Sequence, residues 1–124
     1  FLFVLTLSSF AGEAWEVKQA NNFFTLEKDN ISYPIVSDGG SPQFIKEKEF
    51  NKTFSALIYK SGEVGSQKII IMERALLFKD GKYVEDVPYR NYEKGSDENI
   101  DIEWKISEDS LEIIDNADNK KWKF

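Results

Sequence analysis

Ile100-Asp101-Ile102-Glu103-Trp104-Lys105-Ile106 is the stretch of this sequence that most directly decides its fold. Its even-numbered residues are apolar and its odd-numbered residues are charged. Because successive side chains of a β-strand point to opposite faces, the stretch predicts a strand with one buried face and one wet face. Polar turns at 107–110 and 115–119 separate it from two further strand-like segments, 111–114 and 121–124. The end of the chain therefore predicts a three-stranded antiparallel meander.

A second strong signal is Asp80-Gly81, which lies between two strand-like segments, 68–78 and 82–87. Asp-Gly favours the positive φ angles of a type I′ turn, whose twist suits two paired strands. The first segment contains a run of β-branched residues, typical of a strand that is covered on both faces. A helix over 72–78 that ends at Gly81 is the competing interpretation, but the apolar run and the turn together favour a strand. Pro88 has no N–H to donate and is expected to end the ladder.

The first half of the chain has the same alternation of short apolar segments and polar turns. Further strands are expected at 15–19, 23–28, 31–36, 43–50 and 53–60. The segment that contains Pro34 reads as an edge strand, and the Gly- and Ser-rich segment 37–42 reads as a flexible loop. Eight to ten short strands in one domain predict an all-β fold, either a small antiparallel barrel or a two-sheet sandwich.

The N-terminal residues predict export. An apolar run from Phe1 to Phe10 gives way to small residues, as in a signal peptide that is cleaved after Ala14 or after Ala11. A buried N-terminal strand is the alternative. Because a basic leading region and an initiator Met are missing, the expectation is that the chain lacks its first few residues. The predicted organisation is an incomplete signal peptide over 1–14 and one antiparallel β domain over 15–124, located in the periplasm or outside the cell.

The composition excludes several kinds of chemistry. The chain has no Cys and no His, so it cannot build a Ser-His-Asp or Cys-His catalytic group, a disulfide or a conventional zinc site. Its net charge of −6 disfavours nucleic acid and anionic membrane surfaces as partners. Carboxylates are the plentiful reactive groups. Pairs such as Glu47 and Glu49, which share a strand face, read as solvated surface, and the Asx-rich segments 97–101 and 115–119 lack the spacing of a calcium loop.

Aromatic residues supply the candidate contact site. The cluster Tyr89-Arg90-Asn91-Tyr92 follows Pro88 and precedes a polar loop, so it is expected near one end of the barrel. Tyr and Arg are frequent at recognition sites, although two tyrosines covering the rim of the core are the simpler interpretation. In Phe23-Phe24 one ring must point away from the core if the segment is a regular strand, and Phe24 is taken as the candidate contact.

These observations predict a non-catalytic, secreted or periplasmic binding module without a cofactor or metal. Its expected ligand is a small apolar or amphipathic molecule held inside a β-barrel. The alternative is a protein-interaction module, such as an inhibitor of an exported enzyme, and a carboxylate-dependent hydrolase is a remote third. Expected partners are a small ligand or an exported protein, with no nucleic acid and no stable membrane insertion after signal removal.

Overall fold

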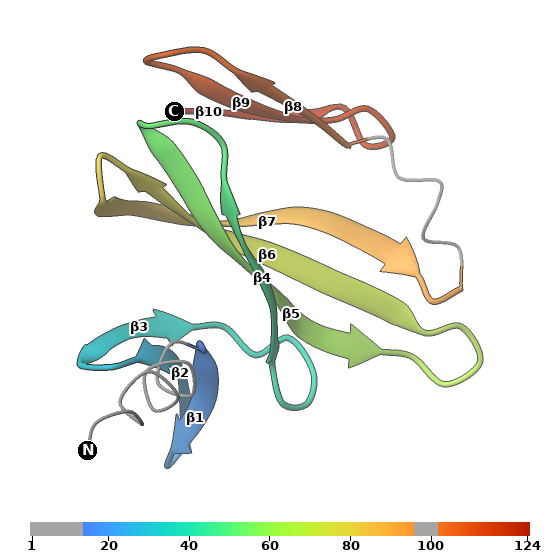
Figure 1. The fold of residues 1–124 in the computed structure, drawn as a ribbon. Helices are drawn as coiled ribbons and strands as arrows, with labels where there is room; N and C mark the ends of the chain where they lie inside the picture. The colour runs from blue at the N-terminus through green and yellow to red at the C-terminus, as the bar shows by residue number, and fades with distance from the viewer. Residues whose placement is uncertain (1–13, 96–101) are drawn as a thin grey trace, which may run out of the picture.

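The computed structural model describes residues 14–95 and 102–124, and these residues form ten β-strands (Figure 1). The strands are β1 (Glu16–Ala20), β2 (Phe23–Lys28), β3 (Ile31–Ile35), β4 (Gln43–Glu49), β5 (Phe54–Val64), β6 (Ile70–Lys79), β7 (Lys82–Glu93), β8 (Ile102–Ile106), β9 (Leu111–Asp115) and β10 (Lys120–Lys123). The all-β class and the number of strands expected from the sequence are confirmed. The predicted signal peptide lies outside the described residues except for Ala14.

The strands form three antiparallel sheets, stacked as three layers in Figure 1. The N-terminal sheet has the order β1-β2-β3, the central sheet β4-β5-β6-β7, and the C-terminal sheet β8-β9-β10. Strand pairing in the described residues closes none of these sheets into a barrel, and there is one layer more than a two-sheet sandwich has. Both architectures predicted from strand spacing therefore need correction. The physical reason is that two strands of the central sheet are apolar on both faces, so each face needs a covering layer.

Two hydrophobic cores lie on the two faces of the central sheet. The C-terminal core contains alternate residues of β5 and β6 together with β9, namely Phe54, Ala56, Ile58, Ala75, Leu77, Leu111 and Ile113. The N-terminal core contains the intervening residues together with β2 and β3, namely Leu57, Tyr59, Leu76, Phe78, Leu26 and Ile35. The part of β6 that is covered on both faces is therefore Ala75–Phe78. The isoleucine run that suggested double coverage precedes it, and its Ile70 is only half-buried.

The sequence signals for hairpins are confirmed. Asp80 and Gly81 have φ angles of 53° and 78°, and they join β6 to β7 with Lys79 paired to Lys82. Residues 72–78 belong to β6, so the helical interpretation is wrong. β8, β9 and β10 form the expected meander, and β3 is an edge strand whose Pro34 faces Thr25 of β2.

β7 does not end at Pro88 and continues to Glu93. Ala75 pairs with Val87 while Glu73 pairs with Arg90, so two residues of β7, Pro88 and Tyr89, lie opposite the single residue Arg74 as a bulge. Pro88 is in this bulge, on a strand at the edge of the central sheet. Because the ladder is interrupted there, the missing N–H of proline removes no pairing hydrogen bond. The prediction that Pro88 ends the ladder is wrong for that reason.

β5 is also longer than predicted, because a bulge at Ser61 carries it on to Val64. Beyond Lys60 its outer edge is paired with the loop before β4. The Asp38 N–H donates to the Ser61 carbonyl at 2.8 Å, and the Glu63 N–H donates to the Gly39 carbonyl at 3.1 Å. The loop that the sequence indicated as flexible is thus hydrogen-bonded to the central sheet.

Candidate binding site

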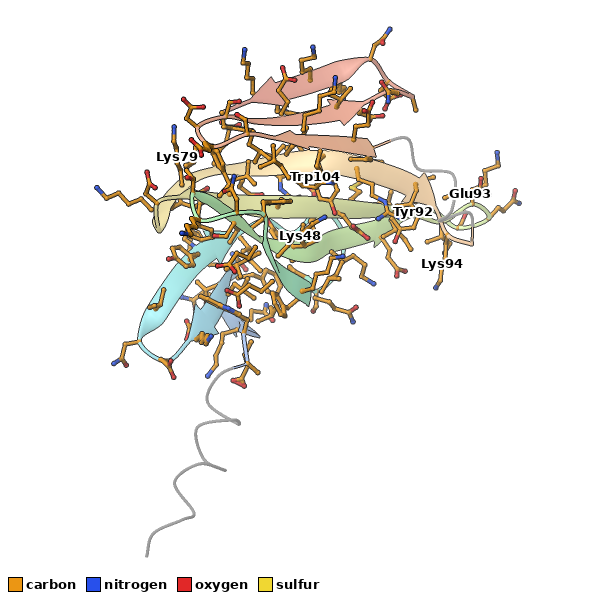
Figure 2. All side chains as sticks on the ribbon, turned by 45° about the horizontal axis from the view of Figure 1, so that its top comes forward. Lys48, Lys79, Tyr92, Glu93, Lys94 and Trp104 are labelled. Atoms are coloured by element: carbon orange, nitrogen blue, oxygen red, sulfur yellow. The ribbon has the colours of Figure 1, made fainter. Side chains whose placement is uncertain are left out.

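The cluster predicted to contact a partner lies within β7 and is organised by a buried carboxylate. Glu73, only 6% exposed, accepts hydrogen bonds on Oε1 from the Tyr89 hydroxyl at 2.8 Å and from Arg90 Nη1 at 3.2 Å. Its Oε2 accepts a hydrogen bond from the Tyr92 hydroxyl at 3.0 Å. Figure 2 shows Tyr92 at one end of the central layer. Glu73 therefore brings together three of the four cluster residues, and sequence reasoning had not singled it out.

Aromatic contacts strengthen this Glu73 cluster. The Arg90 guanidinium lies 4.0 Å from the centroid of the Tyr92 ring, and the Tyr89 ring meets Trp104 edge-on at 5.2 Å. Burial, and then the negative charge of Glu73, raise the pKa of the Tyr89 hydroxyl well above its ordinary value. Asn91 is exposed. The contacts of the cluster join β7 to β6 and to the C-terminal core, which is a structural role, and its contact with a partner stays a prediction.

Phe24 is half-buried and packs against the N-terminal core. Its neighbour Phe23 is 72% exposed, so Phe23 carries the ring that points away from the core. Contact of Phe24 with a ligand or partner stays a prediction. The alternation along β2 places Phe24 on the same face as Leu26, which is fully buried.

A second polar cluster lies on the opposite face of the central sheet. The Tyr59 hydroxyl donates to Asp86 Oδ2 at 2.6 Å, and it accepts a hydrogen bond from the Val36 N–H at 3.1 Å. Arg74 Nε donates to Asp86 Oδ1 at 2.9 Å. Burial, and then the hydrogen bond to the Asp86 carboxylate, raise the pKa of Tyr59 well above its ordinary value. This Asp86 cluster ties the end of β3 to three strands of the central sheet.

Neither polar cluster is arranged as a metal site. Among residues 14–95 and 102–124, no group of three or more Asp, Glu, His or Cys side chains is placed to hold a metal ion. In the Asx-rich segment 115–119, the Asp115 carboxylate accepts hydrogen bonds from the N–H groups of Ala117 and Asp118 at 3.0 and 3.2 Å. That carboxylate stabilises the turn between β9 and β10. The other segment, 97–101, lies outside the described residues.

A mainly apolar pocket of about 160 Å³ opens between the N-terminal sheet and the central sheet. Its lining residues are Trp15, Ile31, Tyr33, Glu47, Ser55, Ala56, Leu57, Phe78 and Gly81. Leu57 and Phe78 come from the buried part of the central sheet, whereas Trp15 and Tyr33 belong to the N-terminal layer. We call this cavity the interlayer pocket. It is one of the cavities that the described residues offer to a ligand, and its lining is mainly apolar.

Aromatic rings form one wall of the interlayer pocket. The Tyr33 ring lies 5.9 Å from Trp15, 5.0 Å from Phe78 and 6.1 Å from Tyr83, measured between centroids. Such mutual contacts hold the rings in fixed orientations. Ile31 and Tyr83 are each 49% exposed, which leaves apolar surface next to the opening. The pocket therefore combines an aromatic wall with an accessible apolar rim.

Charged residues of β4 divide between the two faces of the central sheet. Glu47 and Glu49 pair with Leu57 and Ser55, so both carboxylates are on the side of the interlayer pocket. Lys48 extends to the other side, where its Nζ lies 5.1 Å from the Trp104 ring centroid (Figure 2). Burial, and then the charge of Lys46, lower the pKa of Lys48. The predicted sharing of one face by Glu47 and Glu49 is confirmed.

Sequence reasoning missed the interlayer pocket. Nothing in the spacing of Trp15 and Tyr33 shows that they meet Leu57 and Phe78 of another sheet. The sharing of a face by Glu47 and Glu49 was the available signal, because an acidic strand face next to an apolar layer marks a boundary between core and solvent.

Comparisons with known proteins do not assign the chain to a family: no family model matches it, and neither the curated proteins nor the solved structures give a significant match. The residues that the structure describes contain no helix of the length and apolarity needed to cross a membrane.

Proposed function

We propose that this protein is a non-catalytic binding module that docks on a partner protein by accepting one side chain of the partner in the interlayer pocket. The size of the pocket carries the proposal. A cavity of about 150 Å³ holds a benzene-sized group, whereas pockets for drug-sized ligands start at about 300 Å³. At about 160 Å³, the interlayer pocket suits a group as large as one side chain.

The surroundings of the pocket support a protein partner. Interfaces derive most of their binding energy from a few anchor residues in well-packed pockets, ringed by contacts that exclude water. Ile31 and Tyr83 provide exposed apolar surface of that kind beside the opening. Apart from Trp15 and Gly81, the lining residues are on paired strands, which hold an anchor site more precisely than a loop does.

Location in the periplasm or outside the cell is part of the same proposal. With the predicted signal peptide at 1–14, the partner is an exported protein, and inhibition of an exported enzyme is one form that this binding takes. A hydrolase would need two carboxylates facing each other across its substrate. In the described part of the chain, the interlayer pocket is lined by one carboxylate, Glu47.

A small amphipathic ligand is the second candidate, because the same pocket combines apolar walls with the Glu47 carboxylate. The ligand would then lie between two sheets and not inside a barrel. Native mass spectrometry distinguishes this candidate, since a bound small molecule adds mass that disappears when the protein is denatured.

A pocket-filling variant tests the main proposal. Ser55 lines the pocket and is half-buried, so Ser55→Leu is expected to fill part of the cavity. Ser66→Leu is the matched control, because Ser66 is exposed between β5 and β6. Wild-type protein is used to capture partners from the native secretome, which are then quantified by mass spectrometry. We expect Ser55→Leu to lose a partner that Ser66→Leu retains. If Ser55→Leu still captured the partner and Asn91→Ala did not, the partner-binding site would be assigned to the Glu73 cluster and not to the interlayer pocket.

A further inference from the structure

We propose that the side chain accepted by the interlayer pocket is that of a lysine, with its ammonium group beside Glu47. This inference rests on the proposed function and adds the chemistry of the anchor residue. It is argued from the charges of β4, from the aromatic wall and from the dimensions of the cavity.

The charges of β4 favour a cationic group. Within Lys46-Glu47-Lys48-Glu49, the alternation of the strand places both carboxylates on the pocket side and carries Lys48 to the opposite side. Glu47 lines the pocket, and Glu49 is paired with Ser55, another lining residue. The mouth of an otherwise apolar cavity therefore has a negative edge. The net charge of −6 adds a longer-range attraction for a basic partner.

The aromatic wall favours the same group. A cation is attracted to the face of a Trp or Tyr ring, and aromatic pockets are a common way to bind alkylammonium groups. The chain already makes this contact with one of the lining residues, because Lys28 Nζ lies 5.7 Å from the centroid of the Trp15 ring. Its own lysine thus shows that the Trp15 ring accepts an ammonium group. Lys28 is also expected to compete with an incoming lysine.

The dimensions fit a lysine stem. Beyond its Cα, a lysine has four methylene carbons and one nitrogen, fewer heavy atoms than the benzene that a cavity of about 150 Å³ holds. Leu57 and Phe78 provide apolar contacts for the methylenes, and Glu47 receives the ammonium at the edge. A lysine commonly buries its stem on apolar surface while its charge stays near water.

Two matched probes test the inference. N-acetyl-lysine methylamide and N-acetyl-norleucine methylamide share the same stem and differ in whether it carries an ammonium group. Each is titrated into ¹⁵N-labelled protein, and the amide signals of Leu57 and Phe78 and the Trp15 indole are followed. We expect the lysine probe to bind about two- to fivefold more tightly, as for one partly exposed charge contact.

Variants then assign the charge preference to named residues. Glu47→Gln is expected to lower the affinity for the lysine probe about two- to fivefold. Its affinity for the norleucine probe is expected to stay unchanged. Lys28→Gln is expected to raise the affinity for the lysine probe. Glu108→Gln is the control, because Glu108 is exposed in the turn between β8 and β9.

The possible failures are distinguishable. Equal affinity of the two probes at the pocket would overturn the lysine inference and would leave the pocket as an anchor site. If neither probe shifted the pocket signals, the lysine inference would be overturned, and the capture experiment with Ser55→Leu would decide the proposed function separately. An unchanged lysine affinity in Glu47→Gln would also contradict the assignment.

Discussion

Glu73 and Arg74 are consecutive residues of β6 whose side chains reach opposite faces of the central sheet, and each joins β6 to β7 through a charged pair. Glu73 accepts a hydrogen bond from Arg90, and Arg74 donates one to Asp86. The bulge of β7 lies between these two pairs. The pairs therefore hold the register of β7 on both sides of the irregularity.

Removal of the Glu73 carboxylate should destabilise the protein strongly. We expect Glu73→Ala to lower the free energy of unfolding by about 3 kcal/mol, because Tyr89 and Arg90 would keep buried polar atoms without an acceptor. Urea denaturation with an unchanged m-value measures this loss. Glu108→Ala is the exposed control, with an expected change within about 0.5 kcal/mol. A loss below about 1 kcal/mol in Glu73→Ala would mean that water replaces the carboxylate.

High pH should destabilise the native state through two tyrosines. The pKa values of Tyr59 and Tyr89 are raised in the folded protein, whereas an unfolded tyrosine titrates near about pH 10. The stabilisation is complete below that pH. Above it the unfolded chain releases protons that the native state retains, so stability falls by about 1.4 kcal/mol per pH unit for each tyrosine.

Denaturation midpoints measured at several pH values above 10 test this slope. Tyr59→Phe and Tyr89→Phe should each flatten it, even though each also lowers the stability at neutral pH by removing a hydrogen bond. Tyr83→Phe is the comparison variant, because Tyr83 is half exposed whereas Tyr59 and Tyr89 are buried. Partial burial, and then the charge of Asp86, raise the pKa of Tyr83. An identical slope in the wild type and in both variants would contradict the prediction.

The contact of β5 with the loop that precedes β4 depends on Gly62. A Cβ at Gly62 would lie 2.5 Å from the Gly39 nitrogen, which is backbone and cannot swing aside. We expect Gly62→Ala to cost about 2 kcal/mol or more by thermal or urea unfolding. At Gly40, with φ of 81°, an added Cβ meets nothing within 4 Å, so Gly40→Ala isolates backbone strain of about 1 kcal/mol. Equal losses in the two variants would show that the loop can move away.

Trp104 is one of the residues that link the C-terminal sheet to the central layer. Its ring stacks on Phe50 at 5.0 Å and meets Tyr89 at 5.2 Å. We expect Trp104→Ala to cost about 2–3 kcal/mol, less than for a fully buried aromatic residue, because the ring is half-buried. Trp104→Phe should recover about half of this loss. Urea denaturation measures both losses, and an unchanged stability of Trp104→Ala would contradict the prediction.

Local signals in the sequence were sufficient for individual strands and hairpins. Asp80-Gly81 predicted its turn because the required φ angles depend on those two residues alone. The alternation around Trp104 predicted β8 because a strand that packs one face on a core has an apolar residue at every second position. Pro88 was misread because its effect depends on whether the strand is an edge and whether a bulge is present, and both are properties of the assembled sheet.

The layers and the site could not be predicted in the same way. Strand spacing is the same whether the sheets number two or three, and the decisive feature was the double coverage of Ala75–Phe78. Glu73 was missed because a single acid within an apolar strand gives no indication of its partners. The walls of the interlayer pocket come from sheets that pack against each other without a shared hydrogen-bonded ladder that a pattern could reveal.

The prolines on two edge strands have a consequence for the behaviour of this chain at high concentration. Pro34 lies in β3 and Pro88 in β7, each at the border of an open sheet. A second molecule that approaches such a border to add its own strand would meet a residue without an N–H, and at Pro88 also a distorted backbone. Cross-β fibrils grow by repeated strand addition of this kind. The two prolines therefore oppose fibril growth along borders that this layered architecture leaves open.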